Sequence, residues 1–365
     1  MKTRTFLSIV LLAGLTILTA ACTKQKKEPV LASISGKAGE VEIVSSKAVW
    51  ESEAGNAVRT VLQAEYPFTP QKENKYRIYN VPPEGFVNVF RAHRNILYLH
   101  IADTCKQKMV VNKNVWAEPQ TMITIFAPNE AAAAELILAE NEKICETFED
   151  AERERVIYNA KKFENASLGS IIRAKFGGSP WFPSSYTMKK NADNFAWISY
   201  ETSYTTQGIF IYRFTYVDDS QFSLDYLVKK RNEVMKENVP GTLEGSYMIT
   251  NPVITPGYWK KSYKGREFTE IRSLWETQND YMGGPFISDA FRSADGKDII
   301  VIEGFVYAPK YDKRDYLRQL EAIIYSWHKK KFVIGKTFSI FAVPFCKRWD
   351  DGGFVYRLGR EIFIL

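Results

Sequence analysis

The sequence predicts an α+β protein, in which an N-terminal α/β domain is followed by an antiparallel sheet domain covered by helices. Two patterns support this prediction. Up to residue 128, short apolar strand-like runs alternate with helical ones. After Tyr186, runs rich in aromatic and β-branched residues dominate and only two helical stretches interrupt them. A chain of 365 residues is long enough for two such domains.

The first domain is predicted from its apolar periodicity. Pro82 and Pro83 break the chain between its second strand and a short helix, and Asn129 is suited to cap the long helix that follows. We expect that long helix to cover residues 131–162, with a break near Glu149. The remaining elements are strands at 40–44, 76–81, 96–101, 109–115 and 120–126, and helices at 48–63 and 86–93.

The second domain begins after a turn-rich stretch that contains Gly177, Gly178, Pro180 and Pro183. Its first helix is predicted to end before Pro240 and Gly241, which cannot continue it. The expected strands cover 195–200, 208–216, 246–250, 268–276 and 299–307, and the expected helices cover 222–238 and 314–327.

The N-terminus has the layout of a lipoprotein signal. Lys2 and Arg4 precede an apolar run from Phe6 to Ala21, which is followed directly by Cys22. A membrane-spanning helix needs about 20 apolar residues, so a transmembrane anchor is the weaker interpretation, as is an ordinary signal peptide. We expect cleavage before Cys22 and acylation of that cysteine, with palmitate or a similar chain, which would attach the protein stably to a membrane.

The predicted organisation follows from this signal. The signal peptide covers 1–21, a lipidated tether 22–35, the α/β domain 36–165 and the α+β domain 170–327. Residues 328–365 form an atypical basic and aromatic tail, for which a terminal hairpin and an altered reading frame are equal alternatives.

The net charge of +7 does not indicate nucleic-acid binding. Residues 329–365 carry a net charge of +5 and the signal peptide carries +2, which leaves residues 22–328 formally neutral. Because phosphate binding needs a concentrated basic face, we exclude a nucleic-acid partner.

Three cysteines remain if Cys22 is acylated. These are Cys105, Cys145 and Cys346, and three cysteines can form at most one disulfide. Cys105 and Cys145 either form that disulfide or are two small buried side chains. The absence of any CxxC spacing gives no support to a metal site or cofactor.

Several short motifs are typical of one family. They include His93-Arg94-Asn95, Trp116-Ala117 with Pro119-Gln120, Gly283-Gly284-Pro285-Phe286, and Arg314 with Tyr316-Leu317-Arg318. In these motifs, over residues 36–325, the chain resembles a family of uncharacterised lipoproteins of Bacteroidota, a domain of unknown function. The resemblance implies an envelope location and no particular chemistry. Lys24, Lys26 and Lys27 resemble lipoproteins that face the periplasm, since surface-exposed ones in this phylum usually carry acidic residues there.

Two candidate sites follow from the second domain. The segment Met282, Gly283, Gly284, Pro285, Phe286 suits a tight hairpin, or else a loop that contacts a ligand. A charged pocket with an aromatic floor is the second candidate, although a solvated, salt-bridged helix surface explains the same pattern. Its residues are Arg272, Trp275, Glu303, Arg314 and Arg318, with Glu321 as a neighbour.

No catalytic motif accompanies these residues. The three histidines have no HExxH or HxH spacing, and Met248 stands where a nucleophile elbow would need glycine. We therefore expect a periplasmic binding or assembly factor, with an envelope protein as a possible partner and an unknown ligand. The alternatives are an envelope hydrolase or transferase, with Glu303, Glu244 and Asp280 as nominal acids, and a glycan-binding module with exposed aromatic rings.

Overall fold

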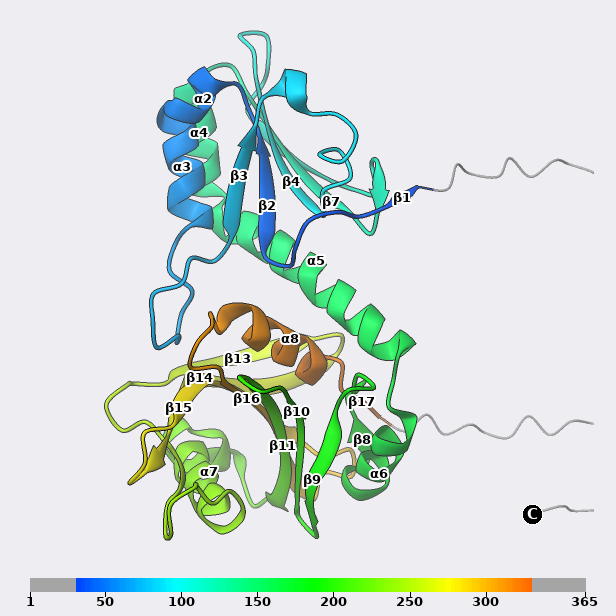
Figure 1. Ribbon diagram of the computed structural model, residues 1–365, viewed down its shortest axis with the longest axis vertical. Helices are drawn as coiled ribbons and strands as arrows, with labels where there is room; N and C mark the ends of the chain where they lie inside the picture. Colours follow the sequence, from blue (N-terminus) through cyan, green and yellow to red (C-terminus); the bar gives the residue numbers. More distant parts are fainter. Residues whose placement is uncertain (1–30, 330–365) are drawn as a thin grey trace, which may run out of the picture.

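The computed structural model describes residues 31–329 of the chain. The predicted signal peptide, Cys22, most of the tether and almost all of the tail lie outside the described residues. Within them, the chain forms two large sheets, one in each half, with the long helix α5 (Asn141–Lys162) running from one to the other (Figure 1). Helices cover both sheets, and the predicted α+β class is confirmed.

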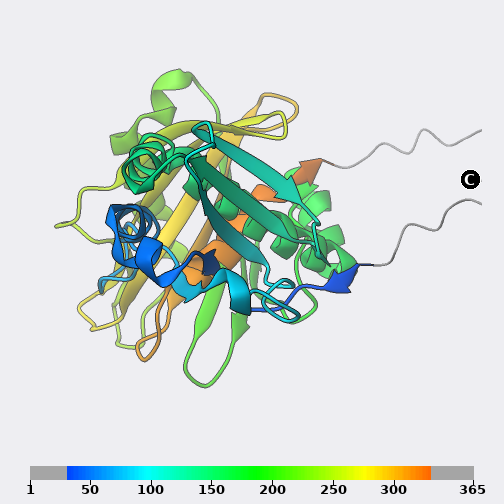
Figure 2. The same ribbon diagram turned by 90° about the horizontal axis from the view of Figure 1, so that it is seen from above.

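The N-terminal half contains a five-stranded sheet with the order β3-β2-β4-β7-β5. Its strands are parallel except β5, which pairs antiparallel with β7 at the edge. Helices α3, α4 and α5 bury one face, where Val41 and Ile43 belong to the main core of this half (Figures 1 and 2). The elements are β1 (Ala32–Ser33), β2 (Glu40–Val44), α2 (Lys47–Glu51), α3 (Glu53–Leu62), β3 (Arg77–Val81), the 3-10 turn η1 (Pro83–Gly85), β4 (Asn95–Ile101), β5 (Lys108–Lys113), β6 (Ala117–Glu118), β7 (Thr121–Ala127), α4 (Glu130–Ala139) and α5.

Three helix predictions in this half need correction. The helix expected at 48–63 is interrupted at Ser52, which ends α2 and caps α3 by accepting from the Ala54 N–H. The long helix breaks at Glu140 and continues unbroken through Glu149. No helix covers 86–93, because the chain there forms turns after η1. The cap at Asn129 is confirmed, since its Oδ1 accepts from the Ala132 N–H at 2.9 Å.

The C-terminal half contains an eight-stranded antiparallel sheet with the order β12-β14-β15-β16-β11-β10-β9, and β13 also pairs with β14. Sequence analysis missed α6, which Asn165 caps and Gly177 ends with a φ of 75°. The elements are α6 (Ala166–Phe176), β8 (Gly178–Ser179), β9 (Thr187–Ala192), β10 (Phe195–Glu201), β11 (Thr206–Thr215), the 3-10 turn η2 (Asp219–Phe222), α7 (Leu224–Asn238), β12 (Tyr247–Thr250), β13 (Gly257–Tyr263), β14 (Arg266–Gln278), β15 (Gly283–Arg292), β16 (Asp298–Tyr307), α8 (Arg314–Tyr325) and β17 (His328–Lys329).

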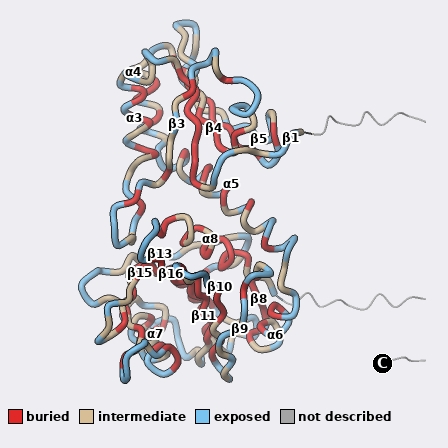
Figure 3. Tube along the Cα trace, in the orientation of Figure 1, coloured by how far each residue is buried: buried red, intermediate tan, exposed pale blue. Residues whose placement is uncertain are grey.

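Two separate cores lie on the two faces of this sheet. Figure 3 shows that its central strands, β11 and β16, are largely buried. Helices α6 and α8 cover one face, and α7 covers the other. The α8 face depends on Gly304, because a Cβ there would lie 2.9 Å from the Cβ of Leu320. A glycine at this position lets α8 pack directly on β16.

The two cysteines of the described region are not bridged. Cys105 lies in the turn after β4, whereas Cys145 lies on α5, where its thiol approaches the Val61 carbonyl oxygen of α3 at 3.9 Å. Both side chains are partly buried, and burial raises the pKa of the Cys145 thiol. The disulfide alternative is therefore wrong for this pair, and Cys346 lies outside the described residues.

The two halves are joined at the start of α8. The helix has no cap from its own Lys313 side chain. Instead the buried Glu73 of the N-terminal half accepts from the backbone N–H groups of Lys313 and Arg314, at 2.8 and 2.9 Å. A carboxylate at this position satisfies two unpaired donors and also interacts favourably with the helix dipole.

We expect Glu73→Ala to lower the free energy of unfolding by about 1–2 kcal/mol, because two buried N–H groups lose their acceptor. Urea unfolding followed by circular dichroism measures this change. Glu135→Ala is the matched control, since Glu135 is exposed on α4, and it should change stability by less than about 0.5 kcal/mol. Equal effects of the two substitutions would contradict a capping role.

Candidate functional site

The sheet separates the residues of the predicted charged pocket. Arg272 lies on the α8 face, where it pairs with Glu321 of that helix. Trp275 belongs to the core on the α7 face, and Glu303 pairs there with Arg231 of α7. Because neighbouring strand residues alternate between faces, these side chains do not line one cavity.

The segment from Met282 to Phe286 lies mainly within a strand. The turn between β14 and β15 is made by residues 279–282, and Asn279 has a φ of 62° there. A Cβ on Gly284 would lie 2.0 Å from the Val306 carbonyl oxygen, so this glycine allows two backbones to approach closely. Phe286 is fully buried beneath the Arg231 guanidinium, 4.0 Å from its ring centroid.

Glu303 forms a buried ion pair with Arg231. The Arg231 Nε and Nη2 donate to Glu303 Oε2 and Oε1 at 2.8 and 2.7 Å, and both residues are almost completely buried. Burial raises the pKa of the Glu303 carboxyl, and Arg231 opposes that shift. This acid has no access to a substrate, and its geometry is that of a structural pair.

Arg314 and Arg318 both face the N-terminal half. Arg314 donates to the Asn74 carbonyl oxygen and to Asp315, while Arg318 pairs with Glu149 of α5 and donates to the Lys75 carbonyl oxygen at 2.7 Å. They share one side of α8, as their spacing predicts, and they connect the two halves of the chain there.

A buried acid–arginine cluster lies next to these contacts. It consists of Glu270, Arg272, Glu321 and Arg153, with the Tyr325 hydroxyl donating to Glu270 Oε2 at 2.6 Å. Burial alone would raise the pKa of Glu321, but Arg272 and Arg153 hold it at about 2. The cluster therefore keeps ionised carboxylates inside the interface between α5, α8 and the sheet.

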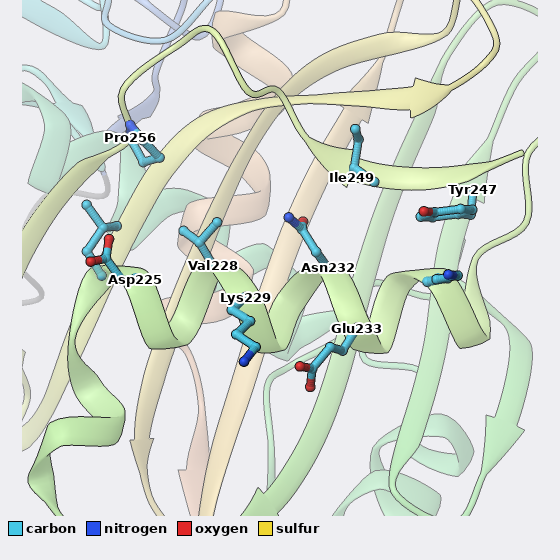
Figure 4. A pocket seen from close by; sticks show the side chains of 10 residues that line it. Asp225, Val228, Lys229, Asn232, Glu233, Tyr247, Ile249 and Pro256 are labelled. Carbon is cyan, nitrogen blue, oxygen red and sulfur yellow. The ribbon is translucent and has the colours of Figure 1, made fainter.

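A groove of about 640 Å³ lies between α7 and β12 (Figure 4). Asp225, Lys229 and Glu233 follow one another at four-residue intervals along the helix side of this groove. The backbone N–H of Thr250 in β12 is already bonded to the Asn232 Oδ1 at 2.9 Å, and that of Met248 to the Val239 carbonyl oxygen. The charges alternate in sign along α7, which is typical of a solvated helix surface. Because these backbone N–H groups of β12 already have acceptors, they are not free to bind a further strand.

A larger cavity of about 1070 Å³ lies where the β13–β14 hairpin meets the end of α8 and the end of α6. Six cationic side chains and only two acidic ones line it, together with many aromatic rings. The cations are Lys260, Lys261, Lys264, Arg266, Arg292 and Lys329, the acids are Asp219 and Glu267, and the rings include Trp181, Phe222, Phe268, Phe291, Tyr325 and Trp327. This volume and composition suit a small organic anion.

The hairpin geometry places Arg266 at the cavity. Lys264 and Gly265 form a two-residue turn in which both φ angles are positive, at 47° and 79°, as in the turns that favour tight hairpins. Arg266 follows this turn as the first residue of β14. Its guanidinium lies 4.8 Å from the ring centroids of both Phe268 and Phe291.

Arg266 has donors without a partner among the described residues. Its Nη2 donates to the Ile324 carbonyl oxygen at 3.2 Å and lies 3.4 Å from Asp289 Oδ2, whereas its Nε and Nη1 are buried and make no hydrogen bond there. Burial raises the pKa of the Asp289 carboxyl well above its ordinary value, against the attraction of Arg266. Arg266 therefore has one long ion-pair contact with Asp289, and two of its donors have no acceptor among the described residues.

The sequence contained a signal for this cavity that our motif search missed. Residues 258–268 interleave four cationic residues with aromatic ones, and the tight turn at Lys264 and Gly265 folds them against each other. The partners from β15, α6 and α8 come from distant parts of the chain, so the run alone does not define a site.

The other two nominal acids lie in loops at one end of the sheet. Glu244 and Asp280 lie in the loops before β12 and after β14, neither lines the cavity, and Thr242 donates to Asp280. No group of three or more histidines, cysteines and acids within residues 31–329 is placed to hold a metal ion. Trp275 is buried, whereas Trp259 is exposed and packs edge-on against Phe68. These two tryptophans therefore do not form a row of exposed rings.

Two family models divide this chain. Residues 34–161 match a domain of unknown function (DUF8532), and residues 165–326 match another (DUF4837). Both halves match families without an assigned activity. The cavity lies almost entirely in the DUF4837 segment, which also contains the whole of the eight-stranded sheet.

The comparison with solved structures gives a distant likeness. A crystal structure of a protein from Bacteroides thetaiotaomicron VPI-5482 is 11% identical, with a TM-score of 0.25. The match covers 43% of this chain and 46% of that one, so this chain spans less than half of that protein. No curated protein matches the chain. Among residues 31–329, no helix is both long and apolar enough to cross a membrane.

Proposed function

We propose that this protein is a lipid-anchored binding protein of the cell envelope, whose cavity takes an anionic amphiphile. The expected ligand carries a carboxylate, sulfonate or phosphate attached to an apolar or aromatic group. Cys22 attaches the protein to the outer membrane through acyl chains, and the domains face the periplasm.

The observation that carries the ligand proposal is the state of Arg266. Two of its buried donors have no partner among the described residues, and its guanidinium faces two aromatic rings. These two donors are closed to solvent, so an anion in the cavity would accept from them after a rotation of the Arg266 side chain, and its apolar part would pack on the rings that line the cavity. Lys261 and Lys264 already pair with Glu270 and Glu154. Lys260 and Arg292 line the cavity without an ion pair within residues 31–329 and favour the same charge of ligand.

We expect Arg266→Gln to weaken binding of the anionic aromatic probe 8-anilinonaphthalene-1-sulfonate about tenfold or more, because a charge-assisted hydrogen bond is lost. The mature chain with Cys22→Ala needs no detergent, and its fluorescence titration gives the dissociation constant. Arg266→Lys should restore part of the affinity. Lys229→Gln, in the groove beside α7, is the control and should leave the affinity unchanged.

Equal affinity for the probe in the parent and in Arg266→Gln, with both proteins folded by circular dichroism, would reject the cavity as the site. Because the chain continues from Lys329 at the rim of the cavity, a variant ending at residue 329 is informative. Tighter binding in that variant would identify the chain's own residues 330–365 as a competitor for the cavity.

The anchor is tested separately. Cells that express the full chain should incorporate labelled palmitate into it, and the protein should fractionate with the outer membrane. The Cys22→Ala chain should incorporate no label and leave that fraction. Labelling that persists in the variant would overturn acylation at Cys22. Crosslinking and affinity purification from envelopes of the same two strains would show whether a stoichiometric protein partner depends on the anchor.

A further inference from the structure

Exposed apolar side chains gather on the N-terminal half, in the turns after β3 and beside β6. Val87, Val89 and Phe90 are 44%, 62% and 43% exposed, and Val115 is 37% exposed. We call these four residues the apolar patch. Isolated exposed apolar residues are common on soluble proteins, but several together indicate a contact surface.

The patch is held in place by packing and hydrogen bonds. Phe86 packs edge-on against Trp116, with ring centroids 5.2 Å apart, which joins the turns after β3 to the segment that contains Val115. Gln120 donates to the Arg91 carbonyl oxygen at 2.6 Å and Arg91 donates to that of Phe86 at 2.9 Å. The apolar side chains therefore point outward from an ordered backbone.

The N-terminal chain enters the fold beside this patch. Strand β1 pairs with β6, directly after Val115 and Trp116. Ser35 then donates through its Oγ to the Val89 carbonyl oxygen at 2.9 Å, and through its N–H to that of Ala92 at 2.8 Å. Figures 1 and 2 both place β1 at the side of the N-terminal half opposite to helices α2 and α3.

The distance to the anchor is limited by the chain. Nine peptide steps separate Cys22 from Leu31, and even a fully extended chain of that length reaches only about 30 Å. The side of the domain where β1 begins must then lie near the bilayer to which Cys22 is attached. Since the apolar patch borders β1, it lies on that side of the domain.

We infer that the apolar patch inserts into the interfacial layer of the membrane and sets the orientation of the protein on it. This inference rests on the proposed acylation of Cys22. Valine and phenylalanine side chains bury favourably among the upper acyl chains, and the neighbouring Arg91 and Lys113 are exposed and able to reach head groups. A fixed orientation would hold the cavity of the C-terminal half at a constant height above the lipid.

The test uses the full acylated chain in vesicles of phosphatidylethanolamine and phosphatidylglycerol. The photoreactive residue p-benzoylphenylalanine is placed at Val89 in one variant and at Val253 in the other. Val253 is 82% exposed in the C-terminal half and serves as the matched control. After illumination, mass spectrometry counts covalent phospholipid adducts.

We expect at least about ten times more lipid adduct at Val89 than at Val253. Equal yields at the two positions, or adducts at Val89 only to a second protein copy, would overturn the inference. The intact mass of each chain shows in the same experiment whether Cys22 is acylated. Failure of the anchor is thereby distinguished from failure of the patch.

Discussion

Arg231→Leu should lower the free energy of unfolding by about 3–5 kcal/mol, because Glu303 would remain as a buried carboxylate without its partner. Arg231 makes three hydrogen bonds to this acid, and the side chain of Glu303 is completely buried. Urea unfolding at neutral pH measures the loss. Lys229→Leu, on the exposed side of the same helix, should change stability by less than about 0.5 kcal/mol.

The double variant Arg231→Leu/Glu303→Leu distinguishes the loss of the ion pair itself from the cost of leaving Glu303 charged and unpaired. Replacing both charges by apolar groups should recover at least half of the lost stability, since no uncompensated charge remains. The single variant should also lose less stability below about pH 4.5 than at pH 7, because Glu303 is then protonated in the folded state. A single variant that stays within about 1 kcal/mol of the parent would show that water or another group compensates Glu303.

Glu321→Gln is expected to remove about 3 kcal/mol at pH 7. The pKa of Glu321 is held at about 2 in the folded protein, by Arg272 and Arg153 and against the effect of burial, compared with an ordinary value of 4.5. A carboxyl whose pKa is lowered by folding stabilises the protein above the unfolded pKa and loses that contribution as the pH falls toward the folded one. About 2 kcal/mol should be lost between pH 5 and 3.

The measurement is a series of urea unfolding curves between pH 3 and pH 7. The parent should lose stability along this range, and the difference between parent and Glu321→Gln should shrink as the pH falls. Glu154→Gln is the control, because Glu154 lies on α5 but is 51% exposed and pairs only at the surface. A difference that stays constant with pH would mean that packing, and not ionisation, explains the loss.

Local patterns were sufficient to predict most of the longer strands and the cap at Asn129. Strand β2 lies at its predicted residues because the β-branched Val41, Ile43 and Val44 stand in a short run between a glycine and two serines. Helix α6 was missed because its apolar residues at 168, 172 and 176 lie in a stretch full of small and polar residues. The break in the long helix depends on how α4 and α5 pack around α3, which no local pattern contains.

The candidate site was harder to predict, because its residues meet partners that are distant in the sequence. Arg314 and Arg318 were expected together and do share one side of α8, but their partners include Asn74 and Glu149, which are far away in the sequence. Arg272 and Glu303 lie on opposite faces of one sheet, a separation that appears only when the pairing of β14, β15 and β16 is known. The cavity is similarly assembled from distant segments.

The cap that Glu73 provides for α8 affects how the chain can be divided. The boundary between the two family segments falls after α5, yet the first turn of α8 depends on an acid from the other segment. A fragment starting at residue 165 would lose that acid and also Glu149, and it would expose Arg318 and the apolar side of α8. We therefore expect the two segments to unfold together, and the C-terminal segment to be insoluble when it is produced alone.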